Sequence, residues 1–104
     1  MYKILITSSD DNAVLNDIAK VLTIKKLSPC SNIIQDVKSF YLWDNKFIDE
    51  NESLLIIKCE VSDIKKIEKI IYQKHNYEIP EIISIDFNII SKEYKNWFNK
   101  DKLQ

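Results

Sequence analysis

The sequence predicts a single α+β domain whose strands and helices follow the order β-α-β-β-α-β, with a short C-terminal helix after them. Two stretches, residues 15–22 and 64–71, have apolar side chains at helical spacing, and each follows a run of strand-forming residues. Between them, residues 30–59 have the composition of two long strands around a turn. A chain of 104 residues is the size of one domain, so residues 1–104 are assigned to one unit.

The first strand is expected at residues 3–7, where three consecutive apolar side chains are typical of a central strand buried on both faces. Residues 8–11, Ser-Ser-Asp-Asp, follow and supply a hydroxyl cap and negative charge for the start of a helix. The apolar stripe of this helix runs from Leu15 to Leu22, and Pro29 ends it.

The second and third strands form a long hairpin. Residues 30–43 are strand formers, and the polar pair Gln35 and Asp36 in their middle indicates a bulge. Asp44 and Asn45 are expected to make the turn, because both tolerate left-handed geometry in a chain that has no glycine. The return strand occupies residues 46–59. Each arm is about twice the usual five or six residues, so the tip should project unless other subunits receive it.

The second half of the domain repeats the helix and strand. Ser62 and Asp63 are expected to open a helix, residues 75–82 connect it to a half-exposed strand at 83–87, and Ser91 caps the last helix. Two right-handed split βαβ units in this order predict a ferredoxin-like plait, in which two helices cover one face of a four-stranded antiparallel sheet.

The composition excludes several partners and cofactors. The net charge is −1 and charged residues make up 30% of the chain, so no basic surface is expected to recruit nucleic acid or an anionic membrane. The apolar run near the N-terminus is too short for a signal sequence or a membrane span, which favours a cytoplasmic location. The absence of glycine argues against phosphate-binding and dinucleotide-binding loops. Cys30 and Cys59 lack paired spacing and are expected to be free thiols.

Two residues are candidate metal ligands. His75 is the only histidine, and one imidazole supplies too few ligands for a closed site, so it is either a weak metal ligand or a residue that orients its own connection. Cys30 is the alternative, as a copper(I) ligand, although a small buried side chain is the favoured interpretation.

A ligand cleft is expected around the connection at residues 75–82. Tyr77, Glu78 and Glu81 could act together as an acid–base group, but carboxylates beside a subunit boundary more often pair with lysines such as Lys58. We therefore expect a binding cleft formed by these four residues and no enzyme activity.

Several separated segments resemble the CutA family of divalent-cation tolerance proteins. Residues 30–34 resemble its Cys-x-Asn-Ile-Ile segment, 39–43 its Ser-x-Tyr-x-Trp segment, 54–58 its Leu-x-Ile-Lys strand, and 75–82 its His-Pro-Tyr-Glu-x-Pro-Glu-Ile signature. Tyr94 and Trp97 match its terminal helix. The resemblance implies a cytoplasmic homotrimer of ferredoxin-like subunits with a role in tolerance to copper and other divalent metals.

The sequence departs from the family pattern where metal ligands are expected. Some bacterial members have a cysteine at the end of the first strand and two adjacent histidines, which are implicated in copper binding. The matching positions here are Thr7 and Lys74, which leaves only His75, and Asn76 replaces the proline of the signature. Glycines of the family are replaced by Asp36 and Asn45. Copper or another divalent cation is therefore expected to bind weakly, and no cofactor is certain.

Three function classes follow from these observations. The leading one is a homotrimeric binding or sensing protein for metal-ion tolerance, in which Tyr41, Trp43 and Phe47 at the hairpin tip lie in the trimer interface. The alternative is a trimeric scaffold or small-ligand signalling module with no metal role. The third is an enzyme that uses Tyr77, Glu78 and Glu81.

Overall fold

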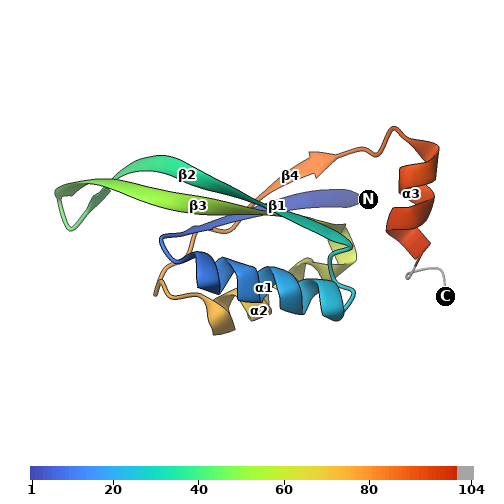
Figure 1. The fold of residues 1–104 in the computed structure, drawn as a ribbon, viewed down its shortest axis with the longest axis horizontal. Coiled ribbons are helices and arrows are strands. Elements are labelled where there is room, and N and C mark those ends of the chain that lie inside the picture. Colours follow the sequence, from blue (N-terminus) through green and yellow to red (C-terminus); the bar gives the residue numbers. More distant parts are fainter. Residues whose placement is uncertain (101–104) are drawn as a thin grey trace.

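A four-stranded antiparallel sheet forms the centre of the protein, seen in a computed structural model that describes residues 1–100 (Figure 1). The strand order across the sheet is β2-β3-β1-β4. The α+β class and the element order are as predicted from the sequence. The elements are β1 (Tyr2–Ser9), α1 (Asn12–Ile24), β2 (Cys30–Trp43), β3 (Lys46–Glu60), α2 (Ile64–Lys74), β4 (Ile83–Phe87) and α3 (Lys92–Asn99).

The helices α1 and α2 lie side by side under one face of the sheet (Figure 1). The core lies between these layers, because alternate side chains of the two central strands point to the helices. Leu5 of β1 faces Ile57 of β3 in the strand register, and both are buried. The remaining buried apolar residues of this core are Leu15, Ile18, Leu22, Leu27, Leu55, Cys59, Ile67, Ile70 and Ile71.

Both covering helices begin where predicted, after Asp11 and Asp63, but their caps differ from the prediction. The carboxylate of Asp11 caps α1 by accepting the Ala13 N–H at 2.9 Å, and Ser9 belongs to β1 instead of providing a hydroxyl cap. A 3-10 turn, Val61–Asp63, precedes α2, and Asp63 makes no side-chain hydrogen bond to the helix end. Sequence patterns at helix ends rarely distinguish such neighbouring caps, because several adjacent polar residues can serve.

The hairpin of β2 and β3 has the predicted bounds and irregularities. The register shifts between Ile34 and Val37, with Asp36 at a φ of 60°. Asp44 and Asn45, at φ values of 50° and 63°, form the turn. The hairpin extends beyond the helices (Figure 1), so the molecule measures 49 × 26 × 20 Å. Its radius of gyration is 14.7 Å, whereas a compact domain of this length would have about 13 Å.

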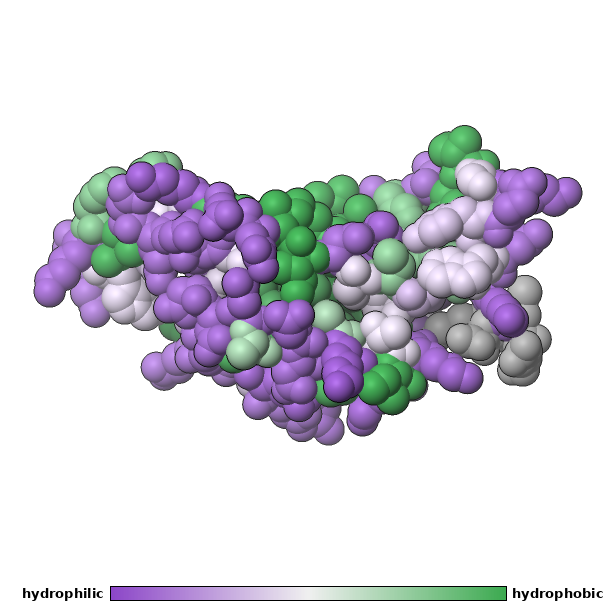
Figure 2. All heavy atoms as spheres, viewed as in Figure 1, coloured by the Kyte–Doolittle hydropathy of each residue, from purple (hydrophilic) through white to green (hydrophobic). Residues whose placement is uncertain are grey.

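The sheet face opposite the helices is apolar and has no covering layer in one chain. The isoleucine side chains of this face lie on neighbouring strands, with Ile4 paired to Ile85 and Ile6 to Ile83 in the register. Ile83 and Ile85 are 49% and 50% exposed, and in β4 only Phe87 is partly buried, which is more exposure than the predicted half-exposed strand. Figure 2 shows hydrophobic residues gathered over the middle of the molecule and along its upper side.

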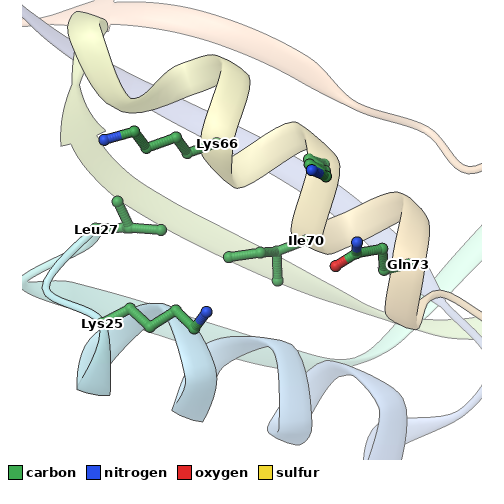
Figure 3. Close-up of a pocket in the computed structure, with 6 residues that line it drawn as sticks. Lys25, Leu27, Lys66, Ile70 and Gln73 are labelled. Carbon is green, nitrogen blue, oxygen red and sulfur yellow. The ribbon is translucent and has the colours of Figure 1, made fainter.

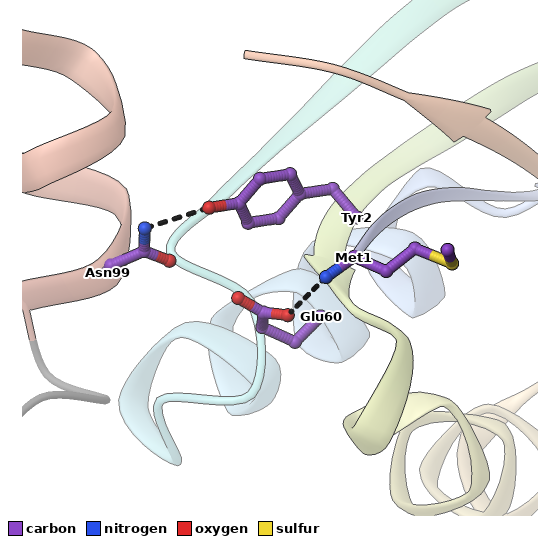
Figure 4. A network of polar contacts seen from close by, with 4 residues as sticks. All are labelled: Met1, Tyr2, Glu60 and Asn99. Carbon is purple, nitrogen blue, oxygen red and sulfur yellow. Dashed lines mark hydrogen bonds and ion pairs between the residues drawn. The ribbon is translucent and has the colours of Figure 1, made fainter. Parts of the chain in front are cut away.

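Aromatic contacts hold α3 against the end of the sheet. Phe98 is 2% exposed and packs edge-on against Tyr2 at a ring distance of 5.4 Å. The amide of Asn99 donates to the Tyr2 hydroxyl at 2.8 Å, and the Met1 amino group lies 3.5 Å from the Glu60 carboxylate (Figure 4). Ser91 caps α3 as predicted, by accepting the Tyr94 N–H at 3.3 Å. Among residues 1–100 there is no helix long and apolar enough to cross a membrane.

Candidate functional site

Residues 75–82, here called the joint, connect α2 to β4 and are held by the imidazole of His75. The Tyr77 N–H donates to His75 Nδ1 at 3.0 Å, so this nitrogen carries no proton. The proton then lies on Nε2, which donates to the Ser8 carbonyl at 2.8 Å. Both ring nitrogens are thus engaged, and the geometry matches the orienting role that was one of the two interpretations of His75.

The hydroxyl of Tyr77 connects the joint to β3. It accepts the Asp10 N–H at 2.9 Å and donates to the Glu52 carboxylate at 2.5 Å. Burial raises the pKa of Tyr77 well above its ordinary value of 10, and the hydrogen bond to Glu52 raises it further. The phenol is therefore neutral at physiological pH. Glu52 itself is only 7% exposed, so this hydrogen bond satisfies a buried carboxylate.

Asn76 ties the joint to the connection between β1 and α1. Its side-chain carbonyl accepts the Ser9 hydroxyl at 2.6 Å, and its amide donates to the Asp10 carboxylate at 2.8 Å. A proline at this position, as the resemblance implies for the family, could make neither bond. Three successive residues of the joint therefore contact the end of β1 or the start of the loop that follows it.

A hollow of about 340 Å³, here called the joint hollow, opens where the joint meets the hairpin. Its lining includes Ser8, Tyr41, Glu52, Tyr77 and Glu81. With Ser39, residues that carry two carboxylates and four hydroxyls therefore border one space, and such hard ligands suit divalent cations or hydrogen-bonding small molecules.

A second hollow of about 350 Å³ adjoins the first and extends along the tip of the hairpin. It shares Tyr41 and Tyr77 with the joint hollow and adds Trp43 and Glu78. The structure thus brings Tyr77 together with Glu81 in one hollow and with Glu78 in the other.

Lys58 does not join the predicted cleft within one chain. Its ammonium donates to Asn32 Oδ1 at 3.1 Å and lies 3.8 Å from Cys30 Sγ. Lys58 pairs with Ile4 in the strand register, whereas the joint contacts Ser8, four residues further along β1. At about 3.3 Å per residue this is a separation of about 13 Å. The sequence could not exclude this lysine, because it does not show which stretch of a long strand lies beside the joint.

Cys30 lies at the same distant end of the sheet, so one chain does not bring it to His75. The thiol is half-buried, and burial together with the nearby Cys30 raises the pKa of Tyr94 in α3. Over residues 1–100, no three His, Cys, Asp or Glu side chains gather in a way that could hold a metal ion.

The predicted interface residues lie uncovered at the tip of the hairpin. Tyr41, Trp43 and Phe47 are 39%, 51% and 68% exposed, and Phe47 stacks on Phe40 at a ring distance of 6.1 Å. The hydroxyl of Tyr41 donates to the Glu50 carboxylate, which raises the pKa of Tyr41 to about 12. The tip therefore presents exposed aromatic side chains, and the hydroxyl of Tyr41 is already hydrogen-bonded.

Sequence reasoning missed Glu52, which is central to the joint hollow. The residue lies in a polar run, residues 49–53, inside the predicted return strand, and it was not among the predicted site residues. A usable signal was present, because Glu52 is two residues before Leu54 and four before Ile56, and so continues an apolar stripe on one face of β3. A carboxylate in such a stripe indicates a buried polar partner.

Comparison with known proteins identifies relatives over almost the whole chain. Residues 3–101 match the family described as CutA1 divalent ion tolerance protein. The Thermus thermophilus divalent-cation tolerance protein CutA is 26% identical over 101 residues, which cover 97% of this chain and 98% of that protein. A CutA homologue from Xenopus laevis is 32% identical over 84% of this chain, which spans only 58% of that longer protein.

Solved structures of similar proteins have the same fold. CutA1 from Shewanella sp. SIB1 superposes with a TM-score of 0.90 at 31% identity, covering 96% of this chain and 94% of that one. The Archaeoglobus fulgidus protein, titled a periplasmic divalent cation tolerance protein CutA, superposes with a TM-score of 0.89 at 27% identity, covering 96% and 97% of the two chains.

Proposed function

The chain belongs to the CutA1 divalent ion tolerance protein family, and on that premise we propose that it is a homotrimeric binding protein that responds to divalent cations. The observation that carries the binding role is the joint hollow, where the buried carboxylate of Glu52 and the carboxylate of Glu81 border one space with Tyr77. Cations bind at such oxygen-lined hollows when solvent and neighbouring chains complete the coordination.

The homotrimer of ferredoxin-like subunits is supported by the apolar surface that one chain leaves uncovered. The open sheet face and the hairpin tip both present large hydrophobic side chains. Such continuous apolar surface is unusual on a monomer and typical of a subunit interface. The edge strands, the long β2 and the short β4, also carry unpaired backbone groups that a neighbouring chain would satisfy.

Light scattering at micromolar concentration tests the assembly. We expect three times the mass of the chain for the wild type and dissociation or unfolding for Trp43→Asp, because the substitution places an unpaired charge in the interface. Lys46→Asp, at the exposed turn next to this tryptophan, is the control for added negative charge and should remain a trimer. A wild-type mass of one chain would refute the proposal, and a stable Trp43→Asp trimer would remove Trp43 from the interface.

Copper is expected to bind weakly, with His75 as its main protein ligand. Copper(II) prefers imidazole and stands highest in the Irving–Williams order. To bind through Nδ1, however, His75 must release the Tyr77 N–H, which costs about 1 kcal/mol, or about a fivefold loss of affinity. With two or fewer side-chain ligands in one chain, we expect affinity in the micromolar range or weaker.

Calorimetry with copper(II) at pH 7 tests this assignment on wild type, His75→Ala, Glu81→Gln and the control Glu68→Gln. His75→Ala should abolish measurable copper binding, Glu81→Gln should weaken it, and Glu68→Gln, an exposed carboxylate of α2 that lines neither hollow beside Tyr77, should leave it unchanged. Tight binding that survives His75→Ala would refute the role of His75 and make Cys30 the next residue to test.

A trimeric scaffold or small-ligand module without a metal role is the second candidate. It is favoured by the hydrogen bonds that occupy both ring nitrogens of His75 and by the absence of a three-donor group in residues 1–100. Thermal unfolding with added copper, zinc and magnesium distinguishes the two candidates, since only a cation-binding protein gains stability with cation concentration.

We propose no catalytic role for this site. Tyr77, which lines both hollows, has a raised pKa and donates to Glu52, so at neutral pH it is not a base. We also propose a cytoplasmic location, which the family resemblance of the sequence implies and which fits the free thiols of Cys30 and Cys59. Cell fractionation with an antibody against the native protein tests it, and enrichment in a periplasmic or organelle fraction would contradict it.

A further inference from the structure

A groove between α1 and α2, on the side of the molecule away from the open sheet face, carries three lysines (Figure 3). The hollow measures about 540 Å³, the size of many small-molecule sites. Lys25 comes from the end of α1, and Lys66 and Lys69 come from α2. Leu27 and Ile70, which are 9% and 8% exposed, form an apolar floor, and Gln73 adds an amide at one end.

The charges of these lysines are not neutralised within the described part of the chain. Lys3, Lys38 and Lys74 each form an ion pair with an aspartate. By contrast, residues 1–100 supply no ion pair or hydrogen bond to the ammonium groups of the three groove lysines. Three positive charges therefore border one hollow in a protein whose net charge is −1.

The dipole of α2 does not account for the position of Lys66. Lys66 is the third residue of α2, in a first turn that contains no acidic side chain. Lysine is unfavourable there, because the N-terminal end of a helix is already positive. Lys25, by contrast, lies at the C-terminal end of α1, where the helix dipole favours a cation.

We propose that this groove, here called the lysine groove, binds a small organic phosphate of about nucleotide size. The ammonium groups would contact the phosphate oxygens as separate point charges, and the floor of Leu27 and Ile70 would contact the apolar part of the ligand. The groove lies on the helix layer, so the trimer proposed above leaves it accessible, and the lysine groove does not depend on the joint hollow or on a metal.

Calorimetry with ATP, pyrophosphate and adenosine tests the lysine groove on the full chain in buffer containing EDTA, which excludes any contribution from divalent cations. ATP is expected to bind the wild type, pyrophosphate to bind more weakly because it lacks an apolar part, and adenosine to give no measurable heat. ATP affinity should fall as salt rises from 50 to 500 mM, since the contacts are exposed charges. No ATP binding at millimolar concentration, or adenosine binding as tight as ATP, would overturn the proposal.

Matched variants show whether the lysine groove is the site. Lys66→Gln with Lys69→Gln should weaken ATP binding at least about tenfold, and Lys25→Gln, on the other helix, should weaken it severalfold. The control pair Lys46→Gln with Lys92→Gln removes the same charge at the hairpin turn and at α3, and should keep wild-type affinity. Equal weakening by both pairs would indicate nonspecific attraction of a polyanion and would refute the assignment, as would unchanged binding in the groove variants.

Discussion

Thr7 presents a buried hydroxyl that has no hydrogen-bond partner in residues 1–100. The side chain lies on the helix-facing side of β1, is 0% exposed, and its Oγ1 is unpaired. An unsatisfied buried polar group costs about 1–3 kcal/mol. Thr7→Val replaces the hydroxyl by a methyl group of similar size in a strand, where valine is favoured. We therefore expect the free energy of unfolding to rise by about 1–3 kcal/mol.

Ser28→Ala is the matched control, because it removes a buried hydroxyl that does have partners. Ser28 is 0% exposed, and its Oγ lies 2.7 Å from the Lys58 carbonyl, 3.0 Å from the Cys30 carbonyl and 3.2 Å from the Ser31 hydroxyl. Removing it leaves buried acceptors without a donor, so we expect a loss of about 1–3 kcal/mol. The two substitutions each delete one hydroxyl but should have opposite signs.

Equilibrium unfolding in urea measures both effects, at one fixed protein concentration because association contributes to stability. With a denaturant dependence of about 1–3 kcal/mol per molar urea, a change of this size moves the midpoint by about 1 M. If Thr7→Val lowered the midpoint, the hydroxyl would have a partner in solution, and the reasoning from its burial would fail. If Ser28→Ala raised the urea midpoint, the hydrogen bonds of the Ser28 hydroxyl would not stabilise the protein, and the reasoning would fail for a hydroxyl that has partners.

Two further predictions concern titration and thiol reactivity. The raised pKa of Tyr77 favours the neutral phenol in the folded state, so the stability that it contributes is complete below the unfolded pKa of about 10 and is lost as pH rises above it. Urea unfolding should therefore show a smaller loss of stability between about pH 10 and 12 for Tyr77→Phe than for the wild type. An equal loss in the two proteins would contradict this. Cys30, which is half-buried, should react with iodoacetamide in the native protein, whereas Cys59, which is 0% exposed, should react only after unfolding. The intact mass gives the number of labels on each chain. Fewer than two labels on the unfolded chain would indicate a disulfide.

The hairpin could be predicted almost to the residue because its determinants are local. Asp36, Asp44 and Asn45 are among the four residues at positive φ in the described chain, which has no glycine. Aspartate and asparagine tolerate left-handed geometry better than other side chains, so their positions mark the bulge and the turn without any knowledge of tertiary contacts. Strand formers on either side then fix the extent of each arm.

The joint hollow could be predicted only in part, because its members come from segments far apart in the sequence. The density of functional groups at residues 75–82 identified Tyr77 and Glu81. Neither composition nor spacing shows that Glu52 on β3 lies within hydrogen-bond distance of Tyr77, 25 positions further along the chain. That pairing depends on the register between β1 and β3, where a shift of one residue would turn Glu52 to the other face.

Thr7 and Lys74, which stand where some relatives have a cysteine and a second histidine, both have structural roles in this protein. Thr7 is enclosed in the core under α1 and α2, and Lys74 pairs with Asp17 of α1 at 3.0 Å. His75, the first residue of the joint, directs its two ring nitrogens to the Ser8 carbonyl and the Tyr77 N–H. A metal at His75 would therefore compete with the hydrogen bonds that hold the joint against β1. Across variants of these residues, those that bind cations more tightly should hold the joint less firmly against β1.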